Sequence, residues 1–204
     1  MIQPAIRPTA EDDDATVVAD VIRGDRAAFE ALYHRHHLTL YRTALAMTRD
    51  RGVAEELLQE AFLRAYRHIG RVVLTPGASL RPWLHRIIIN LSYDWLARRN
   101  PSAGAFDGMV QRLAARASAS PERQAEQREI ERAVDDAIAD LPLKQRVVVI
   151  LFYLHDMDLE AISNTLNVPP GTVKSRLFYG RARLRQRLTA DSALAELSHA
   201  PRTA

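Results

Sequence analysis

DLEAISNTLNVPPGTVKSRLFYGRARLRQRL, residues 158–188, is the stretch that decides the fold. Its first part predicts a short helix, which Asp158 can cap and whose inner face holds Leu159, Ile162 and Leu166. The segment 167–171, NVPPG, has the composition of a turn. A second helix over about 172–188 then carries apolar residues spaced four, seven and four apart: Val173, Leu177, Leu184 and Leu188. Two helices whose inner faces match across a short turn predict a helix-turn-helix.

The opposite face of the second helix is polar and basic. It carries Thr172, Ser175, Arg176, Tyr179 and Arg183. Between residues 141 and 188 there are eight basic residues and three acidic ones, and six of the basic residues lie on the last helix. Arginine and lysine on such a helix can neutralise phosphates or bond to guanine edges in the major groove. The residues therefore favour duplex DNA as the partner of this helix, over a basic helix that is merely solvated.

Composition limits the remaining possibilities. The chain has 204 residues, of which 47% are hydrophobic, 26% charged and only 6% aromatic, with a net charge of +3. This composition favours an all-α protein with one medium or two small domains. No cysteine is present, so disulfides and thiolate chemistry within the chain are excluded, and we expect no cofactor. The N-terminus lacks the apolar segment of a signal peptide, and no apolar run approaches membrane-spanning length. We therefore expect a cytoplasmic protein with no membrane insertion.

Helical periodicity divides the chain into two small helical domains. Residues 1–13 are predicted to be a disordered tail, 14–99 a first domain, 100–121 a flexible linker, 122–188 a second domain and 189–204 a C-terminal tail. In the first domain we expect a helix over about 14–23, which Asp14 can cap and Gly24 can end, and a second helix that Asp25 can cap. Two more helices are expected over about 53–69 and 80–99. In the second domain we expect helices over about 122–139 and 143–154 before the helix-turn-helix.

Three apolar stripes are expected to form the core of the first domain. The helix after Asp25 contributes Phe29, Leu32, Tyr33, Leu40 and Ala44. The next helix contributes Leu57, Leu58, Ala61, Phe62 and Ala65. The fourth helix contributes Leu80, Leu84, Ile87, Leu91 and Trp95.

The fourth helix also carries side chains that suit an exposed nucleic-acid base. Asn90, Ser92 and Tyr93 can hydrogen-bond to a base or stack on it, and Arg86, Arg98 and Arg99 can hold phosphates. From spacing alone, a core helix with an ordinary polar side is the better explanation of these residues.

Four blocks of the chain resemble the extracytoplasmic-function class of sigma-70-type factors. GDRAAFEALY, residues 24–33, is similar to the opening of the sigma-2 domain, and AEELLQEAFLRAY, residues 54–66, to its polymerase-binding helix. WLHRIIINLSYDWLARR, residues 83–99, is similar to the reader of the −10 promoter element. GTVKSRL, residues 171–177, with the arginine-rich run after it, is similar to the −35 reader of the sigma-4 domain. Four blocks in this order, with a linker between the halves, make the resemblance specific.

The resemblance implies an alternative sigma factor that binds core RNA polymerase and opens promoter DNA, and that is not an enzyme. Gln59 and Glu60 match the residues that grip the clamp helices of the β′ subunit, and Glu56 and Leu63 lie on the same helix. An acidic and amide-bearing helix face suits a basic partner, although a solvated face is the simpler explanation of the residues alone. The β flap, promoter DNA and an anti-sigma factor are the other implied partners.

The resemblance also assigns the DNA contacts. Asn90 matches the residue that helps to hold a flipped −10 base, with Arg86, Ser92, Tyr93, Arg98 and Arg99 beside it on the −10 reader. Lys174, Ser175 and Phe178 match −35 contact positions. The remaining −35 candidates share the same helix: Thr172, Arg176, Tyr179, Arg181 and Arg183.

The sequence departs from the family pattern directly after Phe178. Family members usually have Arg-Ala there, whereas this chain has Tyr179-Gly180. Tyr179 cannot form the bidentate guanine contact of an arginine, so the resemblance does not define the −35 sequence. Gly180 is expected to weaken the helix by roughly 1 kcal/mol relative to alanine.

Two other functions fit parts of the sequence. A conventional helix-turn-helix regulator with an N-terminal effector or dimerisation domain would explain 141–188, but not the Gln59-Glu60 block or Asn90. A metalloenzyme could use His34 and His37, which share a helix face, but no third ligand stands at helical spacing. A solvated histidine cluster explains residues 34–37 better.

Overall fold

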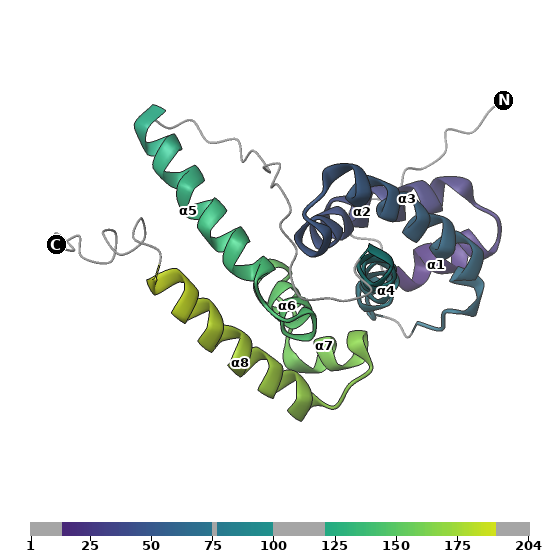
Figure 1. Cartoon of the computed structure of the whole chain (residues 1–204). Helices are drawn as coiled ribbons and strands as arrows, with labels where there is room; N and C mark the ends of the chain where they lie inside the picture. The colour runs from purple at the N-terminus through teal and green to yellow at the C-terminus, as the bar shows by residue number, and fades with distance from the viewer. Residues whose placement is uncertain (1–13, 75–76, 100–120, 191–204) are drawn as a thin grey trace, which may run out of the picture. The chain divides into compact units, whose positions relative to one another are not determined.

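The computed structural model describes residues 14–74, 77–99 and 121–190, and it confirms the all-α class (Figure 1). No strand occurs in these ranges. The elements are α1 (Asp14–Ile22), α2 (Arg26–Thr48), α3 (Arg51–His68), the 3₁₀ turn η1 (Ile69–Arg71), α4 (Arg81–Arg99), α5 (Pro121–Ala139), α6 (Leu143–Val149), the π-helical turn η2 (Ile150–Leu154), α7 (Leu159–Leu166) and α8 (Pro170–Thr189). The chain divides into two compact units, one built from α1 to α4 and one built mainly from α5 to α8.

The predicted tails and linker consist almost entirely of residues that the structure does not describe. Residues 1–13, 100–120 and 191–204 lie outside the described residues. Pro121 already belongs to α5, and residues 189–190 end α8.

Local signals set the ends of the first helices, and those at Gly24 and Asp25 are the ones that the sequence predicts. Gly24 adopts a φ of 94° and closes α1, with its backbone N–H bonded to the carbonyl of Val21. The Asp25 carboxylate accepts hydrogen bonds from the N–H groups of Ala27 and Ala28 and so caps α2. Asp50 caps α3 through the N–H of Val53. Each such cap contributes about 1 kcal/mol to helix stability.

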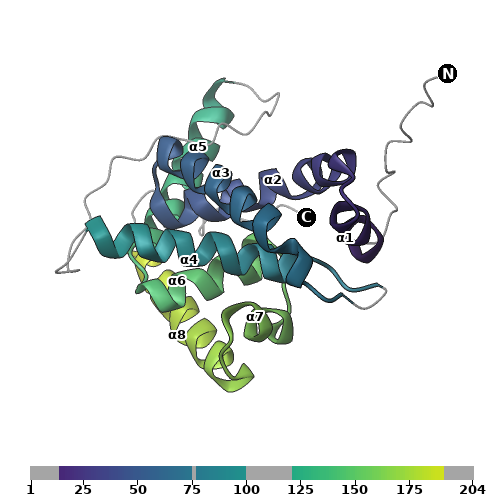
Figure 2. The same cartoon turned by 90° about the vertical axis from the view of Figure 1, so that its right-hand side faces the viewer.

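The core of the first unit lies where α4 crosses α2 and α3 (Figure 2). The predicted stripe on α3 is confirmed, because all five of its residues are buried. On α4 the prediction is only partly right. Leu80, Leu84 and Leu91 are buried, but Ile88 and Ile89 fill the core where Ile87 was expected, and Ile87 and Trp95 remain half-buried. On α2, Tyr33 is exposed and Phe29 half-buried, while His36 and Thr43 join Leu32, Leu40 and Ala44 inside.

In the second unit, α6 and α8 pack directly on each other. Val147, Val148, Val149 and Leu151 are buried from one side, and Val173, Leu177 and Gly180 from the other. The prediction that Leu184 and Leu188 are core residues is wrong in degree, because both are only half-buried. The expected single helix over 143–154 changes to π-helical geometry at Ile150, which inserts a residue into its last turn.

The helix-turn-helix is confirmed, with a shorter turn than predicted. Asp158 caps α7 through the N–H of Ala161 at 2.7 Å. Asn167 ends α7 in the left-handed conformation, at φ 52°, and Ser163 Oγ donates to the carbonyl of Val168 at 2.6 Å. Pro170 then occupies the first position of α8, where its missing N–H costs nothing. The turn therefore spans 167–169, and Gly171 already lies in the helix.

Candidate partner-binding and nucleic-acid-binding surfaces

The outward face of α3 forms a continuous polar and apolar row. Glu56 and Gln59 are exposed, and Leu63 leaves 52% of its surface in solvent. Glu60 is half-exposed, and its Oε1 accepts a hydrogen bond from Arg64 Nε at 2.7 Å. These four residues lie opposite the buried side formed by Leu58, Ala61 and Ala65, so the core fixes the direction in which they point. We call Glu56, Gln59, Glu60 and Leu63 the α3 row.

Tyr66 extends the α3 row at a position that the sequence did not predict. It is 53% exposed, and its ring packs edge-on against Phe29 with the ring centroids 4.9 Å apart. Its place one turn after Leu63 was the available signal. This signal is weak, because an aromatic residue in a helix with an apolar side usually belongs to the core.

The −10 candidates on α4 divide into exposed and buried residues. Arg86, Asn90, Arg98 and Arg99 are exposed, and Tyr93 is half-buried. Arg98 Nε donates to the carbonyl of Asp94, and the guanidinium of Arg99 lies 5.0 Å from the centre of the Trp95 ring. Ser92 has no exposed surface, and its Oγ donates to the carbonyl of Ile88 at 2.8 Å. The prediction that Ser92 contacts DNA is therefore wrong, because it lies on the core side of α4 next to Leu91.

The outer face of α8 carries most of the −35 candidates. Lys174, Ser175, Tyr179 and Arg183 are exposed, and Phe178 leaves 67% of its surface in solvent. Thr172 and Arg176 are half-buried on the flank of the helix. The fully buried Val173 and the nearly buried Leu177 hold the opposite side of α8 against its own unit, which directs this face outward.

Arg181 does not belong to that outer face. Its Nε donates to Tyr153 Oη at 2.5 Å, and its Cζ lies 5.8 Å and 5.5 Å from the ring centres of Phe152 and Tyr153. The guanidinium is therefore held against η2 by a hydrogen bond and cation–π contacts. The sequence prediction placed it among the −35 contacts because an arginine-rich run gives no direction to its individual members.

The histidines at 34–37 have separate surroundings. His37 Nδ1 lies 3.1 Å from the carbonyl oxygens of both Tyr33 and His34, and its ring stacks on Tyr33. His36 is buried beside Asp14, which corrects the expectation of a solvated cluster. Within the part of the chain that the structure describes, no three histidine, aspartate or glutamate side chains are grouped to hold a metal ion.

Comparison with known proteins decides the family. Residues 32–101 match the family model of Sigma-70 region 2, and residues 131–184 match that of Sigma-70, region 4. The chain is 36% identical to the ECF RNA polymerase sigma factor SigM of Mycobacterium tuberculosis over 85% of its own length and 84% of that protein. It is 30% identical to the ECF RNA polymerase sigma factor SigW of Bacillus subtilis, over 84% and 94% of the two chains. The chain belongs to the extracytoplasmic-function sigma factors of the sigma-70 family.

A solved structure has the same fold. The sigma factor RpoE of Bartonella quintana, crystallised with the anti-sigma factor NepR, superposes with a TM-score of 0.64 at 24% identity, over 80% of this chain and 98% of that one. As a sigma factor, the protein directs promoter-specific transcription initiation by RNA polymerase and is a specificity factor, not an enzyme. Membership of this family replaces both the conventional regulator and the metalloenzyme as explanations of the sequence. Among the described helices, none combines the length and apolarity needed to cross a membrane.

Proposed function

We propose that the two units of this sigma factor read two promoter elements while the first unit grips RNA polymerase. Residues 14–99 bind the polymerase and read and open the −10 element, and residues 122–188 read the −35 element. The observation that carries the proposal is that each unit presents its own outward face: the α3 row and the exposed side of α4 in the first, and the basic outer face of α8 in the second.

The test is run-off transcription with purified core polymerase. We expect discrete start sites, each preceded by paired −35 and −10 elements, when core polymerase and this protein are combined on a library of bacterial genomic fragments. Neither component alone should give them, because the chain supplies DNA recognition and the polymerase supplies catalysis. A complete library without one such start site would refute the proposal.

The α3 row is the proposed contact with the β′ clamp helices. Its acidic and amide groups suit a basic helical partner, and Leu63 adds an apolar centre that the partner can cover. Tyr66 borders this centre and belongs to the same proposed contact. The second unit is the proposed contact with the β flap.

Gln59→Ala combined with Glu60→Ala is expected to weaken core binding. Both changes remove polar groups from the α3 row without touching the buried side of α3, so the fold should stay intact. We expect about a tenfold loss of affinity, the size of one or two interfacial hydrogen bonds. Fluorescence anisotropy of labelled protein titrated with core polymerase measures it.

The matched control is Glu30→Ala, which removes an exposed carboxylate from α2 instead. It should bind core polymerase as the unchanged protein does. Equal affinities for the double variant and the control would show that the α3 row is only a solvated surface.

On DNA, the proposed −35 contacts are Lys174, Ser175, Phe178, Tyr179 and Arg183, with Thr172 and Arg176 at the flank of the helix. The proposed −10 contacts are Arg86, Asn90, Tyr93, Arg98 and Arg99. Ser92 is left out because it is buried, and Arg181 because its guanidinium is bonded to Tyr153 on η2.

An anti-sigma factor is the proposed regulator of this activity. The support is the related RpoE, which was crystallised with the anti-sigma factor NepR. The proposed place of action is the cytoplasm, because RNA polymerase and chromosomal DNA are there in bacteria.

A further inference from the structure

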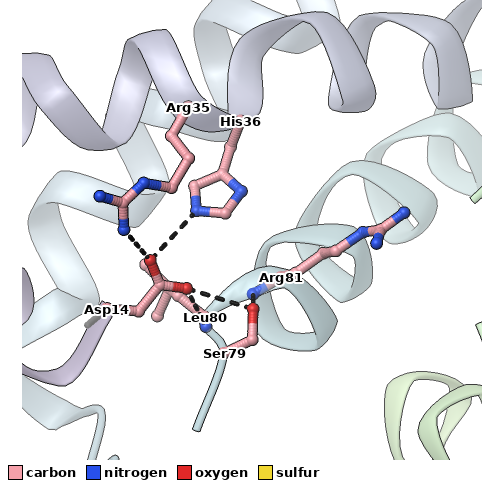
Figure 3. A network of polar contacts seen from close by, with 6 residues as sticks. All are labelled: Asp14, Arg35, His36, Ser79, Leu80 and Arg81. Carbon is pink, nitrogen blue, oxygen red and sulfur yellow. Dashed lines mark hydrogen bonds and ion pairs between the residues drawn. The ribbon is translucent and has the colours of Figure 1, made fainter. Parts of the chain in front are cut away.

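Asp14, the first residue of α1, lies where three helices of the first unit meet (Figure 3). It is only 7% exposed. Its Oδ1 accepts a hydrogen bond from Arg35 on α2 at 2.5 Å and lies 3.7 Å from His36 Nε2. The sequence predicted that this carboxylate caps its own helix, but it points away from α1 toward its neighbours.

The second carboxylate oxygen serves the start of α4. Asp14 Oδ2 accepts hydrogen bonds from the backbone N–H of Leu80 at 2.7 Å and from Ser79 Oγ at 3.1 Å. Ser79 Oγ in turn accepts from the N–H of Arg81, the first residue of α4. The N–H groups at a helix start have no partner within the helix and must find one outside it. Asp14 therefore provides, from α1, part of the cap of α4, through Leu80, which stands 66 residues later in the chain.

The carboxylate holds its charge in this place. Burial opposes ionisation, but the contacts with His36, with the N–H of Leu80 and with Arg35 outweigh it and bring the pKa of Asp14 below its ordinary value. A negative charge at the N-terminus of α4 is also favoured by the helix dipole. In Figure 3 the Arg81 side chain extends away from the carboxylate, so Arg35 is the residue of opposite charge that the figure draws in contact with Asp14.

We propose that Asp14 is a positioning residue for the −10 reader, acting through the cap that it gives to α4. The inference rests on the proposed function of α4. Asp14 lies outside residues 32–101, the segment that matches Sigma-70 region 2. Its contacts therefore connect α1 to α4, the proposed −10 reader. Arg86 and Asn90 stand about 9 and 15 Å along the helix from Leu80, at a rise of about 1.5 Å per residue. Fraying of the first turn should therefore disturb these two contacts more than Arg98 and Arg99 at the far end.

Asp14→Ala, Asp14→Asn and the control Asp20→Asn test this inference in assembled holoenzyme. Alanine removes the cap and the charge, whereas asparagine keeps an acceptor oxygen for Leu80 and loses the pairing with Arg35. Asp20 lies on the same helix but pairs only with Arg23 at the surface in the described contacts. Each holoenzyme is transcribed on a promoter library in which every −10 and −35 position is varied.

The readout is discrimination, the ratio of transcription from the best base to that from other bases at one position. This ratio does not depend on how much of the protein is folded, so a merely stabilising role leaves it unchanged. We expect Asp14→Ala to reduce −10 discrimination about tenfold, the change that corresponds to one hydrogen bond to a charged group. Asp14→Asn should lose less, and Asp20→Asn nothing. Discrimination at −35 should be unchanged in all three.

Asn90→Ala, measured in the same library, distinguishes failure of the Asp14 inference from failure of the proposed function of α4. If Asn90→Ala loses −10 discrimination while both Asp14 variants keep it, Asp14 is only a stabilising residue and the inference is wrong, although the proposed function stands. If all of these variants keep −10 discrimination, α4 is not the −10 reader and both proposals fall. If Asp14→Ala does not fold, the −10 discrimination of Asp14→Asn decides between these outcomes.

Discussion

Gly180→Leu is expected to abolish duplex DNA binding by unfolding the second unit, which contains α8, while α1 to α4 keep their structure. A Cβ atom added at Gly180 would lie 2.9 Å from Cγ2 of Val149 and 3.7 Å from Cβ of Gln145 on α6. Val149 is a stiff β-branched residue in the core, so it cannot move aside. A leucine adds three further carbons at this contact. Overpacking by even a few carbons costs about 1–3 kcal/mol or more, a large share of the stability of a small unit.

The measurement is a two-dimensional amide NMR spectrum of the full chain. Signals from residues 129–190 should collapse to unfolded positions in Gly180→Leu, and those from 14–99 should remain dispersed. The control is Ala182→Leu, the same kind of enlargement two residues later at an exposed position of α8. Dispersed signals from residues 129–190 in Gly180→Leu would show that α6 and α8 can separate without loss of the fold.

Gly180→Ala tests two opposing effects on the stability of the second unit. Propensity alone favours Gly180→Ala by about 1 kcal/mol, but the 2.9 Å contact with Val149 opposes that gain. We expect a net loss of stability. The loss should shrink when Val149→Ala is present, because the two sites are in contact and their effects are not additive.

Much of the fold could be predicted because its signals are local. Asp25 and Asp158 each cap a helix within three residues of themselves, and Gly24 ends α1 through its own backbone conformation. The buried side of α3 follows from regular spacing. The α3 row could be placed for the same reason, since an outward face is the remainder once the buried face is known.

The positions that sequence reasoning misplaced depend on contacts between distant segments. Asp14 looked like a cap for α1, but its partners stand 21 and 66 residues away. Gly180 looked like a weakness in α8, and only the approach of Val149 explains why a side chain there is costly. No periodicity within one helix contains such information.

The errors on α4 have a different origin. The run Arg86-Ile87-Ile88-Ile89-Asn90 offers three successive apolar residues, and spacing alone allows more than one of them to face inward. The structure buries Ile88 and Ile89, and with this rotation Ser92 also turns inward. Asn90 remains on the exposed side, so the main −10 candidate survives the correction.

Asn90→Ala is expected to impair promoter opening while leaving −35 recognition intact. Taking a base out of the stack costs a few kcal/mol, which hydrogen bonds and stacking in the reading site must offset. The asparagine amide offers both a donor and an acceptor to a base edge, and Asn90 is exposed on α4 to do so. Its loss should lower open-complex formation on duplex promoters by about 1–3 kcal/mol and blur the preference at one −10 position.

Lys174→Ala is the counterpart on the other unit and should weaken closed-complex binding to duplex DNA. If the lysine holds a phosphate, affinity will fall equally for all sequences, and the slope of log K against log salt concentration will become shallower by about one. If the lysine reads a base, the base preference at one −35 position will weaken. Lys144→Ala, which removes an exposed lysine from α6, is the matched control and should change neither. Transcription of one promoter library by all three holoenzymes, with open complexes followed by permanganate footprinting, gives both readouts. A shift of −35 preference alone in Asn90→Ala would remove the −10 reader from α4, because a residue that acts on an unstacked base has no means of changing how a distant duplex is read.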